Sequence, residues 1–210
     1  MTRAPFISLD GIDGTGKSTQ CRLLVDWLNN HGVPTIGCAD PGGTPLGSQL
    51  REILLASRAE ITARAESLLF MASRAELVEK VILPNLEQGK VVISDRFVAA
   101  NVVYQGHARD ISPDDLWQVG RFSTAGLLPN LTIILDLSVE QAIVRRGRTA
   151  DRMEARGESY LQRVRDGFLV EARMQGFRIV NAVSDVQTLH REIVAMVREF
   201  LKTRGIEVQP

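Results

Sequence analysis

The chain of 210 residues has only two cysteines, no excess of either charge and no apolar run long enough to span a membrane. Cys21 and Cys38 cannot form a disulfide framework, so we expect free thiols in a reducing compartment. Acidic and basic residues number 25 each, which argues against a nucleic acid polymer or a membrane surface as a partner. No signal sequence precedes the first apolar segment, and we therefore expect a cytoplasmic protein.

Strand and helix patterns alternate along the whole chain. Short apolar runs predict strands at 5–10, 34–38, 90–94, 131–136 and 177–181. Apolar residues at helical spacing predict helices at roughly 17–30, 46–56, 61–88, 98–106, 113–125, 139–146, 155–175 and 186–203. This alternation predicts an α/β fold in three layers, with a parallel five-stranded sheet between helices on both faces. No linker or repeat interrupts it, so we expect a single domain over residues 1–210.

The most informative motif is the segment 11–18, Gly-Ile-Asp-Gly-Thr-Gly-Lys-Ser, which has the G-x-x-x-x-G-K-[ST] pattern of a phosphate loop. It lies between a predicted strand and a predicted helix, and this context favours a fold of the P-loop NTPase type. Glycines allow backbone N–H groups to approach a polyphosphate, and the helix directs its positive end at the same anion. We expect ATP to be bound by Gly11, Asp13, Gly14, Thr15, Gly16, Lys17, Ser18 and Thr19. A plain glycine-rich turn is the alternative, but it leaves the Lys-Ser-Thr sequence unexplained.

Three side chains of this loop carry specific expectations. Lys17 can reach the β- and γ-phosphates of ATP, and the Ser18 hydroxyl can ligate Mg²⁺. The carboxylate of Asp13 is unfavourable beside a polyphosphate unless it faces Mg²⁺ or a donor on the acceptor molecule. A side chain that simply faces water is its alternative reading.

Further candidates follow the other predicted strands, because ligands of open parallel sheets bind beyond the carboxyl ends of the strands. Asp95 is expected to hold Mg²⁺ or its waters, and Arg96 to clamp a phosphate; a surface ion pair between them is the alternative. Asp136 is a second candidate metal ligand. Asp40 opens an Asp-Pro-Gly-Gly-Thr loop that is either functional or only a turn, and Thr44 can cap the next helix.

A basic stretch with glycines at both ends covers residues 145–157. Its arginines are Arg145, Arg146, Arg148, Arg152 and Arg156. This composition suits a lid that closes over transferring phosphates, although a solvated helix end has the same composition.

Several short motifs occur together in one order: Pro41-Gly42-Gly43-Thr44, Leu68-Leu69-Phe70 with Arg74, Asp95-Arg96-Phe97, Tyr104-Gln105-Gly106 and Asp151-Arg152-Met153-Glu154. In this combination the sequence resembles the thymidylate kinases. The resemblance implies a nucleoside monophosphate kinase-like fold, transfer of the γ-phosphoryl group of ATP to thymidine 5′-monophosphate (dTMP) with Mg²⁺, and a homodimer. A kinase for another nucleoside monophosphate or a deoxynucleoside is the alternative enzyme. A nucleotide-binding module without phosphotransfer is disfavoured because the guanine-selecting Asn-Lys-x-Asp motif is absent from the sequence.

The resemblance also implies roles in binding the acceptor base and sugar. Phe70 stacks on the thymine, for which core packing is the alternative, and Arg74 reads its O4 atom. Asn101 bonds the Watson–Crick edge, while Tyr104 packs against the sugar and disfavours a ribose. Gln105 belongs to the same expected site.

Contacts to the sugar and phosphate are implied in the same way. Arg96 and Arg51 hold the acceptor phosphate, Asp13 approaches the 3′-hydroxyl, and Asp95 organises Mg²⁺. Asp40 completes the expected acceptor site, although Ala39-Asp40 replaces the Arg-Glu that is usual in the family. Ala100 replaces a common serine, and both departures put acceptor affinity in doubt rather than the chemistry.

The family obtains its transition-state arginine either from the phosphate loop or from the lid. This chain has Thr15 at the loop position, so the resemblance implies the lid arrangement. Arg148 and Arg152 are equal candidates for this role. The expected catalytic residues are then Asp13, Lys17, Asp95, Arg96, Arg148 and Arg152.

Overall fold

The computed structural model describes residues 3–56, 60–146 and 156–209. Its centre is a parallel sheet of five strands: β1 (Phe6–Asp10), β2 (Thr35–Ala39), β3 (Val91–Asp95), β4 (Leu131–Asp136) and β5 (Arg178–Asn181). Their order in the sheet is β2-β3-β1-β4-β5, and all four pairings are parallel. The central strand β1 is buried at every position, including the polar residues Ser8 and Asp10, as expected for the middle strand of a parallel sheet covered on both faces.

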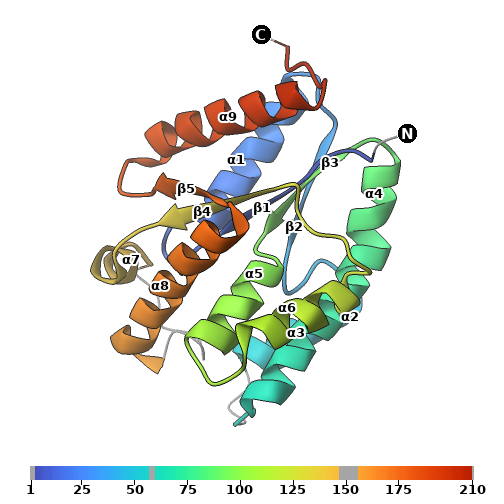
Figure 1. Ribbon diagram of the computed structural model, residues 1–210. Helices are drawn as coiled ribbons and strands as arrows, with labels where there is room; N and C mark the ends of the chain where they lie inside the picture. The colour runs from blue at the N-terminus through green and yellow to red at the C-terminus, as the bar shows by residue number, and fades with distance from the viewer. Residues whose placement is uncertain (1–2, 57–59, 147–155, 210) are drawn as a thin grey trace.

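Helices connect the strands and form the outer layers. They are α1 (Lys17–Asn30), α2 (Pro45–Leu55), α3 (Ala63–Leu77), α4 (Leu83–Glu87), α5 (Val98–Asn101), α6 (Pro113–Ser123), α7 (Val139–Arg146), α8 (Glu158–Gln175) and α9 (Val186–Thr203). Figure 1 shows α1 and α9 together on one side of the sheet and α5 and α8 on the other. The predicted three-layer α/β fold is therefore confirmed.

The long helix predicted over 61–88 is interrupted. A π-helical segment, Val78–Ile82, separates α3 from α4, which begins one residue before Pro84. Proline lacks an N–H group, and its ring collides with the carbonyl one turn earlier in a regular α-helix. The wider π turn accommodates this proline without ending the helical path.

The helix predicted over 98–106 also changes its winding. After the four residues of α5 the chain continues as a π-helical segment, Val102–His107, which carries Tyr104 and Gln105. π-Helical segments are frequent at functional sites because they turn side chains away from their regular α-helical directions. The sequence pattern did not predict either π segment.

Two clusters of buried side chains hold the layers together. In one, Ile7 and Leu9 of β1 pack with Leu24 and Leu28 of α1. In the other, Phe6 belongs to the cluster formed by α3, α4 and α6. Alternate side chains of one strand thus enter different clusters, because successive residues of a strand point to opposite faces.

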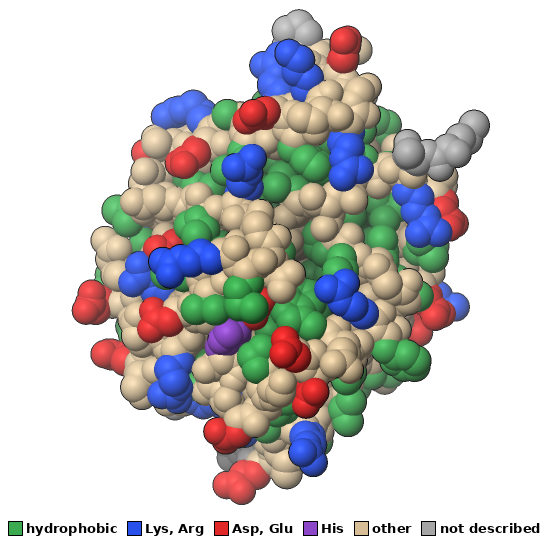
Figure 2. Space-filling view, in the orientation of Figure 1, with side chains coloured by type: hydrophobic (Ala, Val, Ile, Leu, Met, Phe, Trp, Pro, Cys, Tyr) green, Lys and Arg blue, Asp and Glu red, His purple; other side chains and the backbone are tan. Residues whose placement is uncertain are grey.

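The surface and the cysteines agree with the composition. Figure 2 shows acidic and basic side chains interspersed over the face that it presents. No helix within the described ranges has the length and apolar character that a membrane span requires. Cys21 is buried and Cys38 is partly buried, both are free, and burial raises the pKa of both thiols, that of Cys38 to about 12.

Candidate functional site

A cavity of about 310 Å³ lies beyond the carboxyl ends of β1, β2 and β3. The segments that follow these strands contribute Asp13, Lys17, Ser18, Asp40, Asp95 and Arg96. Helices and the second π segment contribute Arg51, Phe70, Arg74, Asn101, Tyr104 and Gln105. Residues expected to bind the phosphate donor and residues expected to bind the acceptor therefore share one cavity.

The phosphate loop is held in a shape that requires glycine. Gly14 and Gly16 have φ values of 92° and 94°, which L side chains rarely adopt. A Cβ atom on Gly14 would lie 2.2 Å from the carbonyl oxygen of Ala142 in α7. Gly16 is the N-cap of α1, so the positive end of this helix faces the region of the loop.

Lys17 is buried inside the loop. Its Nζ donates a hydrogen bond to the carbonyl oxygen of Ile12 at 2.8 Å and lies 3.6 Å from the Asp13 carboxylate. Burial and the nearby Arg96 charge lower the pKa of Lys17. The Thr15 hydroxyl also donates to Ile12, at 2.9 Å, so this side chain turns back into the loop. Thr19 lies in the first turn of α1 and is partly buried.

Asp13, Arg96 and Tyr104 form a compact cluster on the wall of the cavity. Arg96 Nη2 donates to Asp13 at 2.6 Å and to the Tyr104 hydroxyl at 3.1 Å, and this hydroxyl lies 3.3 Å from the second Asp13 oxygen. The other Arg96 nitrogen, Nη1, donates to the Gly11 carbonyl oxygen at 3.0 Å. Burial disfavours ionisation of Asp13, but the Arg96 and Lys17 charges outweigh it and lower the pKa of Asp13 below its usual range.

Arg96 itself has an unusual backbone. Its φ of 71° lies in the left-handed region, where residues other than glycine are uncommon. Its partner is Asp13 and not the neighbouring Asp95, so a local surface ion pair between Asp95 and Arg96 is not what the structure contains. Non-glycine residues in this region concentrate at functional sites, where surrounding contacts hold them.

The two predicted metal ligands are neighbours. The Ser18 hydroxyl donates to Asp95 Oδ2 at 2.5 Å, and both residues line the cavity. Within the described part of the chain no cluster of three or more His, Cys, Asp or Glu could hold a metal by itself. One hydroxyl and one carboxylate suit Mg²⁺, which keeps waters and takes further oxygens from substrate phosphates.

The rival metal ligand, Asp136, has another role in the structure. Both of its carboxylate oxygens accept hydrogen bonds from Arg165 of α8, at 2.7 Å and 2.9 Å. This bidentate ion pair joins the end of β4 to α8. Asp136 does not line the cavity, so it is not placed to act as the second metal ligand that the sequence suggested.

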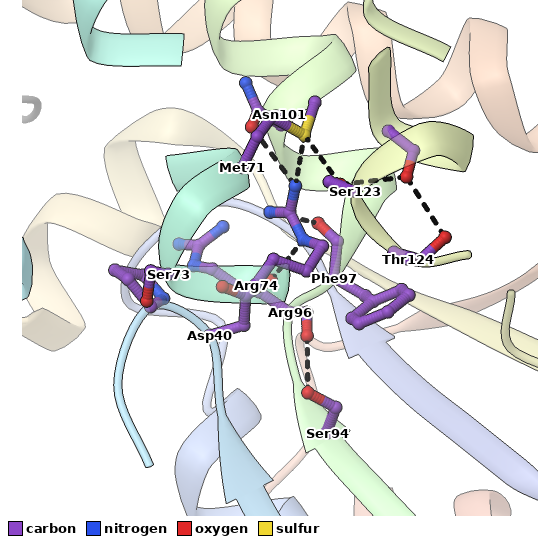
Figure 3. A network of polar contacts seen from close by, with 12 residues as sticks. Asp40, Met71, Ser73, Arg74, Ser94, Arg96, Phe97, Asn101, Ser123 and Thr124 are labelled. Carbon is purple, nitrogen blue, oxygen red and sulfur yellow. Dashed lines mark hydrogen bonds and ion pairs between the residues drawn. The ribbon is translucent and has the colours of Figure 1, made fainter. Parts of the chain in front are cut away.

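Phe70 and Arg74 lie one turn apart on α3 and both line the cavity. Phe70 is only partly buried, which favours a role as an exposed stacking surface over core packing. Arg74, which is 2% exposed, donates to the Asp40 carboxylate at 2.5 Å and to the side-chain oxygen Oδ1 of Asn101 at 3.2 Å (Figure 3). Burial raises the pKa of Asp40 against the opposing Arg74 charge.

Thr44 and Arg51 belong to the start and the middle of the segment formed by the loop after β2 and helix α2. The Thr44 hydroxyl accepts a hydrogen bond from the Gly47 N–H at 2.9 Å, which confirms the expected cap of α2. Arg51 donates to the Pro41 carbonyl oxygen at 2.8 Å, and its side chain reaches the cavity from α2. The loop after β2 is therefore more than a turn, because Asp40 and Pro41 themselves line the cavity.

Two buried carboxylates that the sequence did not single out lie behind the residues that line the cavity. Glu66 of α3 is completely buried and contacts Gln105, Arg109 and Arg156. A glutamate on a helix normally marks the solvent face, and no motif distinguished this one. Asp10, at the end of β1, is also completely buried, and burial raises its pKa to about 6 against the pull of Arg96. Its position directly before the first glycine of the loop was a signal that could have found it.

Arg148 and Arg152 lie outside the described residues, as does most of the segment proposed as a lid. The residues at its two borders are described. Arg145 donates to the carbonyl oxygens of Ala182 and Val183 after β5. Arg156 donates to Glu66 at 2.7 Å, so both borders contact the body of the domain.

The family model for thymidylate kinases matches residues 9–193. The chain belongs to the thymidylate kinase family. A thymidylate kinase of Symbiobacterium thermophilum is 45% identical, over 98% of this chain and 99% of the relative. A thymidylate kinase of Rhodopirellula baltica is 43% identical, over 91% of this chain and 79% of the relative.

A solved structure extends the comparison to three dimensions. The thymidylate kinase of Ehrlichia chaffeensis superposes with a TM-score of 0.75 at 29% identity, covering 93% of this chain and 99% of the other. The family's P-loop, nucleoside monophosphate kinase-like fold is therefore confirmed for this chain. Among the functions considered from the sequence, the comparisons support a thymidylate kinase.

Proposed function

We propose that the chain transfers the γ-phosphoryl group of ATP to dTMP, giving ADP and thymidine 5′-diphosphate. A phosphate oxygen of dTMP attacks the γ-phosphorus, the bond between this phosphorus and the β–γ bridging oxygen breaks, and ADP leaves. The observation that carries the proposal is the single cavity in which Lys17 and Ser18 share space with Phe70 and Arg74. A donor triphosphate and an acceptor nucleotide can meet only in such a shared cavity.

The protein's part in this reaction is to align two anions and to neutralise their repulsion. Lys17 and the backbone of the loop hold the donor phosphates. Arg96, with Arg51 on the same cavity, holds the acceptor phosphate. Asp13 stays ionised and keeps Arg96 in place, so that the guanidinium charge is available without reorganisation.

The donor set at Ser18 and Asp95 fits a Mg²⁺ ion that arrives with ATP, and we propose these residues as its protein ligands. When bound, this ion offsets negative charge on the β- and γ-phosphates. On the acceptor side, Phe70 stacks on the thymine, Arg74 and Asn101 face its hydrogen-bonding edge, and Tyr104 packs beside the sugar. Asp40 and Gln105 hold these side chains in position.

Further parts of the proposal concern the whole chain. We propose a single domain over residues 1–210 with a lid at about 145–157, in which Arg148 or Arg152 stabilises the transition state. An arginine in that role is worth roughly 10³–10⁵ in rate. The kcat of each alanine variant tests this, and a normal rate in both would contradict it.

A homodimer follows from the family resemblance, and light scattering of the purified protein measures it. The free cysteines support a cytoplasmic location.

The decisive experiment is a coupled assay with ATP and a panel of nucleoside monophosphates. We expect dTMP to be the best acceptor. dUMP should retain activity, because one methyl group in a pocket discriminates by only about 1–3 kcal/mol. The corresponding ribonucleotide should be much poorer because Tyr104 occupies the space beside the sugar. Equal kcat/KM for ribo- and deoxy-forms would contradict that role, and turnover of another monophosphate in preference to dTMP would contradict the proposal.

A further inference from the structure

A chain of buried polar side chains leads from the base-binding wall of the cavity to a carboxylate that does not line it. Arg74 donates to the carbonyl oxygen of Asn101 at 3.2 Å, and Asn101 Nδ2 donates to Gln105 Oε1 at 2.8 Å. Gln105 Nε2 in turn donates to Glu66 Oε1 at 3.0 Å. All four side chains are buried, and Arg74, Asn101 and Gln105 line the cavity.

Each end of this series of hydrogen-bonded side chains, Arg74 and Glu66, has only one hydrogen-bonding polarity. A guanidinium group only donates, and an ionised carboxylate only accepts. The side-chain amides of Asn101 and Gln105, considered alone, fit equally well with their nitrogen and oxygen exchanged, because the two atoms have nearly the same size. With Arg74 at one end and Glu66 at the other, a single arrangement of both amides satisfies every contact. Figure 3 shows the resulting orientation of Asn101, with its oxygen toward Arg74.

Glu66 is well suited to hold its end. Arg109 donates to it at 3.1 Å and Arg156 at 2.7 Å, and the carboxylate is completely buried. Two guanidinium groups stabilise the ionised form, in which the carboxylate accepts hydrogen bonds only. Gln105 must therefore turn its NH₂ group toward Glu66 and its oxygen toward Asn101.

The orientation of Asn101 decides which base edge fits. Its NH₂ group is occupied by Gln105 at 2.8 Å and by Ser67 at 3.0 Å, so its carbonyl oxygen, which has a second lone pair, is the group available to a ligand. Thymine offers an N3–H donor beside its O4 acceptor, whereas cytosine offers an N3 acceptor beside an amino donor. An acceptor from Asn101 beside a donor from Arg74 matches thymine and opposes cytosine.

We infer that Glu66 is a specificity-determining positioning residue, which acts through Gln105 to fix the polarity of Asn101 and thereby favours thymine over cytosine. Glu66 does not line the cavity; its effect passes through two amides. This inference rests on the proposed function, because it concerns the acceptor base of the same site.

The test measures kcat/KM for dTMP and for dCMP in the wild type and in Glu66→Gln. The variant keeps the size of the side chain but accepts either orientation of Gln105, so dTMP should lose efficiency relative to dCMP. We expect the dTMP:dCMP ratio to fall about tenfold, the equivalent of one hydrogen bond between uncharged groups. A loss of packing alone would lower kcat/KM for both substrates in the same proportion. An unchanged dTMP:dCMP ratio in a folded variant therefore overturns the inference.

Two further variants make the result specific. Gln105→Leu removes the hydrogen bonds between Asn101 and Glu66 while leaving the Glu66–arginine pairs intact, so the dTMP:dCMP ratio of this variant should fall as well. This variant decides the question if Glu66→Gln does not fold. Arg109→Gln is the matched control, because it removes one ion pair of Glu66 without touching the amides. Its melting temperature should fall but its ratio should stay within about twofold of the wild type. An equal loss of selectivity in this control overturns the inference.

Binding measurements separate this inference from the proposed function. If the wild type does not phosphorylate dTMP, the proposed function fails, and calorimetry with dTMP and dCMP then decides the role of Glu66. A preference for dTMP that Glu66→Gln abolishes supports the inference. A preference that the variant retains, or a wild type that binds both nucleotides equally, overturns it.

Discussion

The phosphate-binding side of the cavity is built from the consecutive residues 11–18, whereas the base-binding side is assembled from segments far apart in the chain. On the first side, glycine backbone and one lysine form the site, and a single β-strand-to-helix connection positions them. On the second side, Asp40 and Arg74 come from opposite ends of the long connection between β2 and β3, and Asn101 comes from the connection between β3 and β4. The first site is therefore local and depends on backbone shape, and the second depends on buried polar contacts between distant elements.

The two sides also differ in how charge is compensated. Lys17 and Arg96 share Asp13 at the wall of an open cavity, where a bound polyphosphate can add negative charge. Arg74 and Asp40 are 2% and 0% exposed, so these two charges compensate each other out of contact with solvent. Changes on the base-binding side should therefore cost stability as well as affinity, and changes on the phosphate side mainly activity.

The largest expected effect is on the base-binding side. Asp40→Ala leaves the buried Arg74 charge without its partner and should lower the free energy of unfolding by about 3–5 kcal/mol. Urea unfolding monitored by circular dichroism measures this. The double variant Asp40→Val with Arg74→Met is the control, because replacing both charges by apolar groups should recover much of the stability without restoring thymidylate binding. A single variant as stable as the wild type would contradict the comparison.

Lys17→Ala is the corresponding change on the phosphate side. Removing one preorganised charge from the transferring phosphates should lower kcat by about 10²–10³-fold, because its stabilisation is strongest in the transition state. Stability should change little, and dTMP alone should bind within about twofold of the wild type because its base contacts lie on the other side. Steady-state kinetics and calorimetry measure the two quantities. Unchanged turnover would remove the assignment of the loop.

Phe70→Ala should weaken the acceptor selectively. Stacking between a base and an aromatic ring is worth about 1–3 kcal/mol, so the KM for dTMP should rise by the corresponding factor while the KM for ATP stays the same. Phe70→Leu is the useful control, since it keeps apolar volume without an aromatic face. Equal KM values in wild type and Phe70→Ala would mean that the ring only packs.

The smallest expected effect concerns Asp10, which lies beneath the phosphate loop. Burial raises its pKa to about 6 from an unfolded value of 3.8, so the folded protein binds the extra proton between these values and loses stability as pH rises through them. Asp10→Asn removes this loss. At pH 7.5, without nucleotide or metal, it should stabilise the protein by about 1–2 kcal/mol, because the buried amide keeps part of the desolvation cost.

The gain in Asp10→Asn should disappear at pH 4, where the wild-type carboxyl is protonated in the folded state. Unfolding curves of both proteins across this pH range provide the measurement. A constant difference between the two proteins at all pH values would show that the Asp10 carboxyl does not titrate as the structure indicates.

Much of the fold was predictable because its signals are local. Short apolar runs marked the five strands to within a residue or two, and the order of strands and helices indicated the parallel sheet. The π segments at Val78–Ile82 and Val102–His107 were not predictable from periodicity. Their winding satisfies tertiary packing and the presence of Pro84, and the apolar pattern alone does not distinguish it from an α-helix.

The candidate site divides in the same way. The rule that ligands bind beyond strand ends located Asp40, Asp95 and Arg96 at the cavity, and the family resemblance located Phe70, Arg74, Asn101 and Tyr104, which line it. Neither argument indicated that Arg96 pairs with Asp13, that Asp136 is engaged by Arg165, or that Glu66 is buried. These are contacts between residues more than 25 positions apart, and nothing local in the sequence encodes them.

The order of residues alone determined the phosphate loop, since glycines, lysine and serine at fixed spacing between a strand and a helix leave the backbone little choice of shape. Only the folded chain decided which buried charges meet and which way each amide points. The direction of a hydrogen bond inside a protein depends on neighbours brought together by packing. The role of a carboxylate such as Glu66 therefore depends on the groups that surround it in the folded protein.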